Sequence, residues 1–202
     1  PAVPVPADDS SRAAVVGLAM GMCSEAEALD RQACLELSRL EYLQGTEWQK
    51  RPQVDLARAV KRYQRPAAGA PPPPASELRP LPVLERTVAY LLQQWLARGD
   101  VPPINRYVFI SDRLRAVQQD MTVQRLHAPI LLARIVRFHL LMELEFCSLA
   151  NAPSAGYSEV QNRSLLCNAL ISALEAPAQL LPAALHAELL SYFVLLHADE
   201  PA

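Results

Sequence analysis

The chain has few of the residues from which phosphate-binding loops, strands and membrane spans are built. Only 6 of its 202 residues are glycine, and none belongs to a glycine-rich loop that could hold a phosphate group. No apolar run reaches the roughly 18 residues of a membrane helix. Alternating positions with β-branched side chains are nowhere sustained over the length of a strand. These shortages argue against a membrane protein, a nucleotide-binding loop and a β-sheet fold.

Lysine and paired cysteines are scarce too. Lys50 and Lys61 are the two lysines, so arginine supplies most of the positive charge. The 4 cysteines include no C-x-x-C pair, and the N-terminal stretch PAVPVPADDSS lacks the basic and apolar regions of a signal peptide. This pattern predicts reduced thiols inside a cell.

Apolar residues are abundant, whereas the net charge is small. Hydrophobic residues make up 51% of the chain, which is ample for one large domain or two small ones. The 19 basic and 21 acidic residues leave a formal net charge of −2, so no global attraction to nucleic acid or to an anionic membrane is expected. Any such binding has to come from a local patch.

Apolar residues recur at steps of three and four, which is typical of amphipathic helices. Ser24 and Glu27 form a capping-box pattern at one helix start, and Gly45 follows the expected end of that helix. The expected helices cover residues 24–45, 54–63, 82–99, 104–126, 129–150, 158–175 and 182–199. About seven helices and no strands predict an all-α fold, an antiparallel helical stack. Periodicity leaves open whether the stack is a bundle or a solenoid.

Two of these helices have patterns that place them in the core. The helix 104–126 carries one apolar stripe, and the helix 129–150 is apolar almost all round, as a central helix covered on several sides should be. The members of the stripe are Tyr107, Ile110, Leu114, Val117 and Met121.

Residues with catalytic or metal-binding chemistry are dispersed along the chain. No Ser or Cys lies in a strained, glycine-rich turn of the kind that exposes a nucleophile. His139 and Glu143 share a helix face with Cys147, but a local pair or a filled gap in the core explains them better than a metal site. The sequence therefore predicts no enzyme, no metal and no cofactor.

The most informative polar feature is a basic run on the expected helix 54–63 and its exit. Its members are Arg58, Lys61, Arg62 and Arg65. Clustered cations suit the phosphates of nucleic acid or an acidic protein partner. The alternative is a solvated helix face, because the helix dipole favours basic residues near a C-terminus.

A second polar group lies on the expected helix 104–126. Its members are Arg106, Asp112, Arg113, Arg115 and Asp120. The two aspartates are eight residues apart, which is about 12 Å along a helix and too far for paired catalytic carboxylates. We expect a structural network of ion pairs that fixes helix packing.

Five blocks of the sequence, taken in order, resemble the helical core of the Sac-three/GANP family. They are MCSEAEALDR (22–31), VKRYQRPAAG (60–69), ELRPLPVLERTVAYLL (77–92), VFISDRLRAVQQDMTVQ (108–124) and RIVRFHLLMELE (134–145). The resemblance is dense from about residue 17 to 150 and weaker to 199, where AELLSYFVLLHA resembles the family's last helix before its winged-helix subdomain.

The sequence departs from the family pattern in two places. Members of the family often open with G-x-C-P-x-M-C-P, whereas residues 17–24 read GLAMGMCS. Ala19 stands where the first cysteine would be, so Cys23 has no nearby thiol with which to bind metal or form a disulfide. The sequence also ends where the winged helix would begin, so the expected fold does not include that subdomain.

The resemblance implies a TPR-like or PCI-like solenoid that acts as a non-catalytic scaffold of a nuclear mRNA-export complex of the TREX-two type. The implied partners are a PCI-domain protein and a small acidic subunit of the DSS-one/Sem-one type. A DEAD-box helicase or an mRNA export receptor and RNA are further implied contacts, and no membrane is expected. The implied location is the nucleus, at the nuclear pore. The alternative is a centrosome- or spindle-associated family member that acts as a protein-interaction module in the cytoplasm.

The proline-rich stretch KRYQRPAAGAPPPPASELRPLP (61–82) admits three interpretations: a flexible linker, a ligand for a proline-reading domain, or an ordered strap. Because RPAAG and LRPLPVL both lie in blocks that resemble the family, we expect an ordered strap at 66–82 with anchored ends. A PxxP ligand stays an alternative for its middle. The expected domains are a flexible segment at 1–16 and a single helical domain at 17–199.

Overall fold

Six α-helices form the core of the fold in the computed structural model, which describes residues 15–67, 69, 71–149 and 156–198. They are α1 (Glu25–Ala33), α2 (Leu81–Tyr90), α3 (Pro103–Val123), α4 (Pro129–Phe146), α5 (Glu159–Leu174) and α6 (Ala183–His197). The shorter helical turns are η2 (Arg39–Glu41), η3 (Ala75–Glu77), η4 (Leu91–Trp95), η5 (Cys147–Leu149) and η6 (Ala178–Leu180). No strand occurs within these ranges, so the predicted all-α fold is confirmed.

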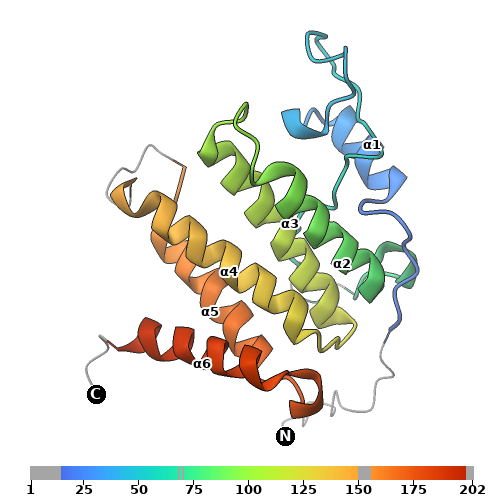
Figure 1. Cartoon of the computed structure of the whole chain (residues 1–202). Helices are drawn as coiled ribbons and strands as arrows, with labels where there is room; N and C mark the ends of the chain where they lie inside the picture. Colours follow the sequence, from blue (N-terminus) through green and yellow to red (C-terminus); the bar gives the residue numbers. More distant parts are fainter. Residues whose placement is uncertain (1–14, 68, 70, 150–155, 199–202) are drawn as a thin grey trace, which may run out of the picture.

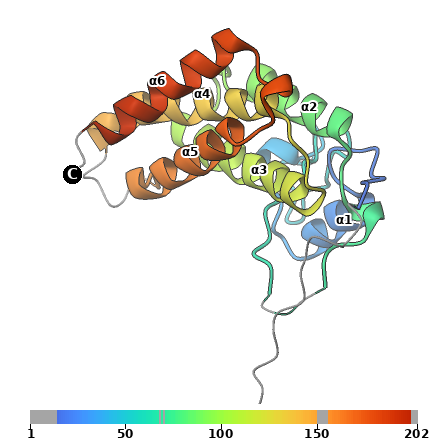
Figure 2. The same ribbon diagram turned by 90° about the horizontal axis from the view of Figure 1, so that it is seen from below.

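The helices α2 to α6 lie side by side, and α1 with the N-terminal segment covers one end of this array (Figure 1). Helix α4 packs most extensively against α5 and also contacts α2, α3 and α6. Viewed from below, α6 and α1 lie on opposite sides of the molecule (Figure 2). The expectation of a central helix at 129–150 is therefore confirmed. Among the described residues, no helix has both the length and the apolar character that crossing a bilayer requires.

The apolar stripe predicted on the helix 104–126 faces the core. All of its members are buried: Tyr107, Ile110, Leu114, Val117 and Met121. They belong to one hydrophobic core with buried side chains of α2 and α4, such as Leu84 and Ile135. Burying apolar surface contributes roughly 25 cal/mol per Å², so this stripe is a main source of the stability of α3.

Prolines lie in the first turn of three helices. Pro103 and Pro129 are the first residues of α3 and α4, and Pro82 is the second residue of α2. Proline is tolerated there because the N–H that it lacks would have no partner within the helix. The predicted helices 82–99, 104–126 and 129–150 are each confirmed, and so are the two that follow them.

The helix predicted for residues 24–45 ends early. Ser24 caps α1 as expected and accepts a hydrogen bond from the Glu27 N–H at 3.2 Å. The helix nevertheless ends at Ala33, and Leu35 takes a left-handed conformation with φ of 60°. A left-handed residue commonly terminates a helix, although glycine is usual there. The prediction of one long helix is wrong.

A second helical start explains this early end. Ser38 and Glu41 form a capping box, in which the Glu41 carboxylate accepts a hydrogen bond from the Ser38 N–H at 3.3 Å. The S-x-x-E pattern at 38–41 carries this signal in the sequence. The turn also brings Glu41 into the interior, where it is fully buried.

The basic helix predicted for residues 54–63 does not form. The backbone N–H groups from Val60 to Tyr63 donate to distant acceptors, and three of these four acceptors are side-chain carboxylates. Hydrogen bonds to a charged acceptor are stronger than those to a carbonyl oxygen. Tertiary partners therefore override the local helix propensity.

His139 fills a polar gap in the core between α4 and α5. Its Nδ1 lies 2.8 Å from Asn162 Oδ1, and Asn162 Nδ2 donates to the His139 carbonyl oxygen at 3.0 Å. Burial lowers the pKa of His139 to about 4 despite the opposing effect of Asn162, so the imidazole is neutral at pH 7. Glu143 does not pair with His139 but with Arg163 of α5.

Some predictions fall on residues that the structure does not describe. These include residues 1–14 of the expected flexible segment and residues 68 and 70 of the expected strap. The proposed boundaries of the helical domain, at 17 and 199, stay predictions.

Candidate functional site

The first described residues run in an extended path beside the end of the strap. The N–H groups of Leu18 and Ala19 donate to the carbonyl oxygens of Ala75 and Leu78 at 2.8 and 2.9 Å. Gly17 allows this close approach, since a Cβ at that position would lie 2.4 Å from the Leu78 carbonyl oxygen. The N-terminal segment therefore ties down the strap where it enters α2.

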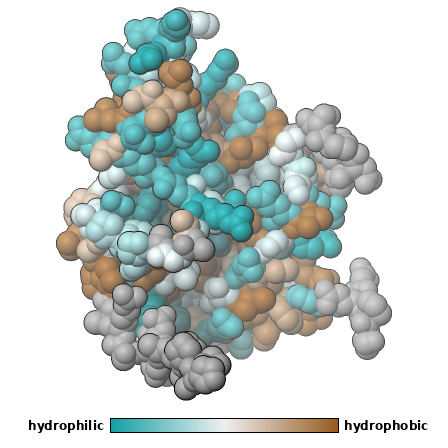
Figure 3. Space-filling model, turned by 180° about the vertical axis from the view of Figure 1, so that it is seen from behind, coloured by the Kyte–Doolittle hydropathy of each residue, from teal (hydrophilic) through white to brown (hydrophobic). Residues whose placement is uncertain are grey.

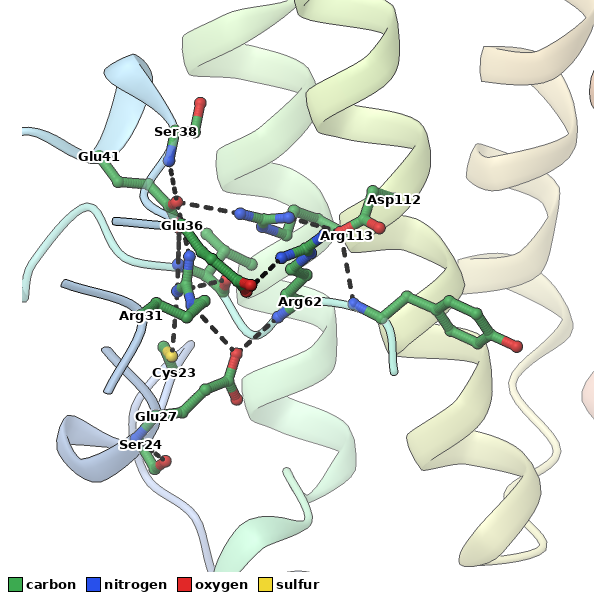
Figure 4. Close-up of polar contacts among 12 residues, drawn as sticks. Cys23, Ser24, Glu27, Arg31, Glu36, Ser38, Glu41, Arg62, Asp112 and Arg113 are labelled. Carbon is green, nitrogen blue, oxygen red and sulfur yellow. Dashed lines mark hydrogen bonds and ion pairs between the residues drawn. The ribbon is translucent and has the colours of Figure 1, made fainter. Parts of the chain in front are cut away.

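Glu41 is the centre of one buried charge cluster, which we call the first cluster (Figure 4). Arg31 of α1 donates from Nη1 to Oε2 at 2.7 Å and from Nη2 to Oε1 at 3.2 Å. Arg113 of α3 donates to Oε2 at 2.9 Å, and the Val60 N–H donates to Oε1 at 3.0 Å. One carboxylate thus joins α1, α3 and the extended segment, residues 59–67.

The surrounding charges keep Glu41 ionised. Burial by itself would raise the pKa of this carboxyl, but Arg113, Arg31 and a backbone N–H together lower it below its usual value. The cluster holds two guanidinium groups, so the charge of Glu41 alone does not balance them. Glu27 pairs with Arg31, and Asp112 pairs with Arg113, which adds the missing negative charge. Such a cluster is stable only as a complete set, because a single unpaired charge in the interior is costly.

Asp120 is the centre of a second cluster further along α3. Arg79 donates from Nε to Oδ2 at 2.7 Å, and Lys61 donates from Nζ to Oδ1 at 2.8 Å. The side chains of Asp120 and Arg79 are each 1% exposed. Lys61 Nζ also donates to the Glu77 carbonyl oxygen at 2.8 Å. The second cluster therefore joins the extended segment, the end of the strap and α3.

The extended segment lies between α1 and α3. The Arg62 N–H donates to Glu27 Oε1 on α1 at 2.8 Å, and the Tyr63 N–H donates to Asp112 Oδ2 on α3 at 3.3 Å. The Arg115 guanidinium group stacks on the Tyr63 ring, 3.9 Å from its centroid. These contacts fix both the backbone and the aromatic ring of the segment.

A groove with a volume of about 1630 Å³ opens between the extended segment, the strap and the C-terminal half of α3, with α1 and α5 also contributing to its walls. We call it the strap groove. Its charged lining residues are the cations Lys61, Arg62, Arg65, Arg79, Arg115 and Arg125 and the anions Glu27, Asp30, Glu77 and Glu175. Three of these cations, Lys61, Arg79 and Arg62, pair with carboxylates outside the lining, Asp120 and Glu36. The charges at the groove are therefore nearly balanced.

The four predicted basic residues have different surroundings. Arg58 stacks on Trp95, with its Cζ 5.2 Å from the ring centroid, and it does not line the strap groove. Lys61 belongs to the second cluster, and Arg62 forms a surface ion pair at 2.8 Å with the carboxylate of residue 36. Arg65 is exposed at the groove and pairs with no carboxylate within the described ranges. The structure therefore brings three of the four to one groove and leaves Arg65 as its most available cation.

The residues predicted to form a network on the helix 104–126 divide between four places. Asp112 and Arg113 belong to the first cluster, and Asp120 to the second. Arg115 lines the strap groove, and Arg106 donates to a backbone carbonyl oxygen just after η4. Most of their partners lie on other elements, so these charges fix the N-terminal region onto α3.

Three members of the clusters belong to neither of the two polar groups predicted from the sequence: Arg31, Glu41 and Arg79. Arg113 is 72 residues from Glu41, and Asp120 is 41 residues from Arg79. No local pattern encodes pairs at such separations. The capping-box pattern at Ser38 was the one available signal, and it marks the position of Glu41 without indicating its burial.

The described residues contain no group of three or more His, Cys, Asp or Glu side chains that could hold a metal ion. Cys23 lies 3.5 Å from the Arg31 guanidinium group, and burial raises its pKa to about 11. This thiol is therefore protonated at pH 7 and is a weak nucleophile. The lining of the strap groove offers both charged and apolar groups for binding.

Known proteins with similar sequences share one family description. A sequence model of the SAC3/GANP family matches residues 22–202. The chain is 35% identical over 138 residues to SAC3 family protein 1 of Schizosaccharomyces pombe, an alignment that covers 65% of this chain and 13% of that protein. It is 30% identical over 148 residues to SAC3 family protein B of Arabidopsis thaliana, which covers 72% of this chain and 8% of that protein. The chain thus corresponds to a small part of the length of each relative.

Proposed function

Because the chain belongs to the SAC3/GANP family, we propose that it is a non-catalytic scaffold subunit of a nuclear mRNA-export complex of the TREX-two type. The family match over residues 22–202 carries this proposal. The link to mRNA export rests on the five sequence blocks that resemble the family core. The residues that match include both charge clusters and most of the lining of the strap groove.

The proposed partners are a PCI-domain protein and a small acidic subunit of the DSS-one/Sem-one type, with a DEAD-box helicase or an mRNA export receptor as a further contact. Helix α6 supports a helical partner, since its outer residues Val194 and Leu195 are 64% and 72% exposed. Figure 3 shows the molecule from behind, where hydrophobic side chains form several separate patches among hydrophilic ones. Exposed apolar patches commonly mark protein–protein contacts.

Recovery of the tagged full-length protein from nuclear extract is expected to bring down a PCI-domain protein together with a small acidic subunit. The paired change Val194→Glu and Leu195→Glu is expected to reduce that recovery at least tenfold, because it places charges in an apolar contact. Mass spectrometry of the purified complex is the measurement, and Val160→Glu on α5, where the replaced side chain is 82% exposed, is the matched surface control. A protein that recovers no PCI-domain partner and stays at the centrosome through the cell cycle would support the alternative role instead.

RNA is the proposed ligand of the strap groove. Its lining includes two exposed cations, Arg62 and Arg65, which can contact a phosphate backbone. Tyr63 and Arg115, stacked on one another in the same wall, offer planar groups of the kind on which bases stack. Arg65 has no carboxylate partner in the described ranges, so no ion pair has to break before it contacts a phosphate.

Arg65→Gln is expected to weaken binding of a single-stranded RNA 20-mer and to reduce the slope of log K against log salt by about 0.7, the value for one phosphate contact on a single strand. Fluorescence anisotropy at several salt concentrations measures both effects. The control is Arg137→Gln, which removes an arginine that pairs with Glu188 and lies away from the groove lining. An unchanged slope in the Arg65 variant would show that this arginine contacts no phosphate and is only part of the solvated surface.

A further inference from the structure

Residues 43–53 form a closed loop that projects from one end of the molecule (Figure 1). Two antiparallel hydrogen bonds close its base, from the Leu43 N–H to the Gln53 carbonyl oxygen and from the Asp55 N–H to the Glu41 carbonyl oxygen, each at 2.8 Å. This base continues directly into the first cluster through Glu41. The loop is therefore anchored to the buried part of the fold.

The interior of the loop is also ordered. Thr46 is only 8% exposed, and its Oγ1 donates to the Leu43 carbonyl oxygen at 2.8 Å and accepts from the Gln53 N–H at 3.1 Å. Gly45 has φ of 88°, and its N–H donates to Glu47 Oε2 at 2.7 Å. The loop thus holds one conformation before any partner arrives, which reduces the entropy lost on binding.

Trp48 lies on this ordered loop with its side chain turned out to solvent. It is 94% exposed, the largest fraction for any large hydrophobic side chain in the described part of the chain, whereas Trp95 in the core is 2% exposed. Tryptophan and arginine are the residues most enriched among the anchors of protein interfaces. Its side chain makes no hydrogen bond or ring contact with the described residues, so its place on an ordered loop points to a contact outside the molecule.

The immediate neighbours of Trp48 define the chemistry of that contact. Lys50 and Arg51 are both exposed and have no carboxylate partner in the described ranges. The one acidic side chain nearby, Glu47, already accepts a hydrogen bond from the loop backbone. The loop therefore presents one aromatic ring beside two available cations.

We propose that residues 45–51 dock, through Trp48, into an apolar pocket with an acidic rim on a partner protein. A convex loop with a single ring fits a pocket, whereas single-stranded nucleic acid takes a groove in which successive bases stack. Two cations and one tryptophan are also too few for stable attachment to a membrane. The loop is separate from the strap groove, because none of its residues lines that groove.

Site-specific photocrosslinking in cells tests this site. With p-benzoylphenylalanine in place of Trp48 of the full-length protein, the expected product is an adduct with one protein, formed at an apolar residue of a pocket that has Asp or Glu at its rim. Adding Lys50→Glu and Arg51→Glu is expected to abolish that adduct. The same probe at Val160, which is 82% exposed on α5, is the control and is expected to give no such product.

Binding of the purified partner then measures the anchor directly. Trp48→Ala is expected to weaken binding at least tenfold, and Trp48→Phe by less, with an unchanged thermal midpoint because the side chain has no contacts to lose in the free protein. Adducts with RNA, with phospholipid or with a second copy of this chain would each overturn the proposal, and so would the lack of any protein adduct. A partner bound equally well by the Trp48→Ala variant would overturn it as well.

Discussion

Replacing Glu41 with alanine is expected to lower the free energy of unfolding by about 3–5 kcal/mol, the range for removing one partner of a buried ion pair. The substitution leaves Arg31 and Arg113 without their shared carboxylate, although their side chains are 4% and 5% exposed. It also removes the acceptor of the Val60 N–H. Urea unfolding followed by circular dichroism measures the change.

The matched control is Glu36→Ala. Glu36 pairs with Arg62 at the surface, where the two side chains are 56% and 43% exposed. An exposed pair of this kind contributes about 0–1 kcal/mol, so the variant should be nearly as stable as the parent. Equal losses in the two variants would contradict the assignment of Glu41 as the buried centre of a cluster.

The same carboxylate predicts a loss of stability in acid. Its pKa in the folded protein is below the ordinary value of 4.5, so the unfolded chain binds the proton first as the pH falls. The stabilisation is present in full above about pH 4.5 and is lost as the pH falls through the folded pKa of Glu41. A Glu41→Gln variant should show a flatter dependence of stability on pH in this acidic window. An identical dependence in both proteins would contradict the lowered pKa.

Asp120→Ala is expected to have an effect of similar size, about 3–5 kcal/mol, because it leaves Arg79 buried without a counter-charge. The Arg79 side chain is 1% exposed and cannot turn to solvent without moving the end of the strap. Lys61, at 16% exposed, loses the same partner. Denaturant unfolding gives the total loss, and hydrogen exchange at Leu18 and Ala19 reports whether the N-terminal segment is released with the strap.

The comparison for Asp120 is Glu188→Ala. Glu188 pairs with Arg137 between α6 and α4, where the two side chains are 29% and 50% exposed, so its removal should cost no more than about 1 kcal/mol. Double substitution of Asp120 and Arg79 should recover part of the loss, since the unpaired buried charge is gone. A double variant that is as unstable as the sum of the two single variants would rule out a direct pair.

These two clusters also bear on the proposed binding site. Lys61 and Arg79 both line the strap groove, and Asp120 holds both of them in place. The extended segment, which carries Arg65 to the groove edge, is attached to α3 through the same carboxylates. The groove therefore depends on buried charges that lie beneath its surface.

The local sequence pattern was sufficient to predict the helices that form the core. The apolar stripe from Tyr107 to Met121 and the prolines at the helix starts depend on neighbours within one or two turns, and the structure agrees with both. Periodicity of this kind reports which side of a helix is buried, because every third or fourth residue faces the same way. It says nothing about which other helix covers that side.

Between residues 34 and 63, the helices predicted from the local sequence pattern do not form. The chain there has helix-forming residues, but Glu41 turns inward to meet Arg113. The N–H groups of Val60, Arg62 and Tyr63 bond to carboxylates far away in the sequence. The bonds to Glu41 from the Val60 N–H and from Arg113 satisfy buried groups that would be costly to leave unpaired inside the protein. Long-range electrostatics thus outweighed a helix propensity of a few tenths of a kcal/mol per residue.

By itself, then, the sequence determined that this protein is all-α, where five of its six described helices lie, and which family its blocks resemble. Only the tertiary structure decided that a run of basic residues becomes an extended segment, that Asp120 and Glu41 are buried centres of charge, and that Trp48 stands alone on an ordered loop. The physical reason is distance along the chain. Apolar periodicity is a property of neighbours, whereas an ion pair between residues 41 and 113 exists only once the chain has folded.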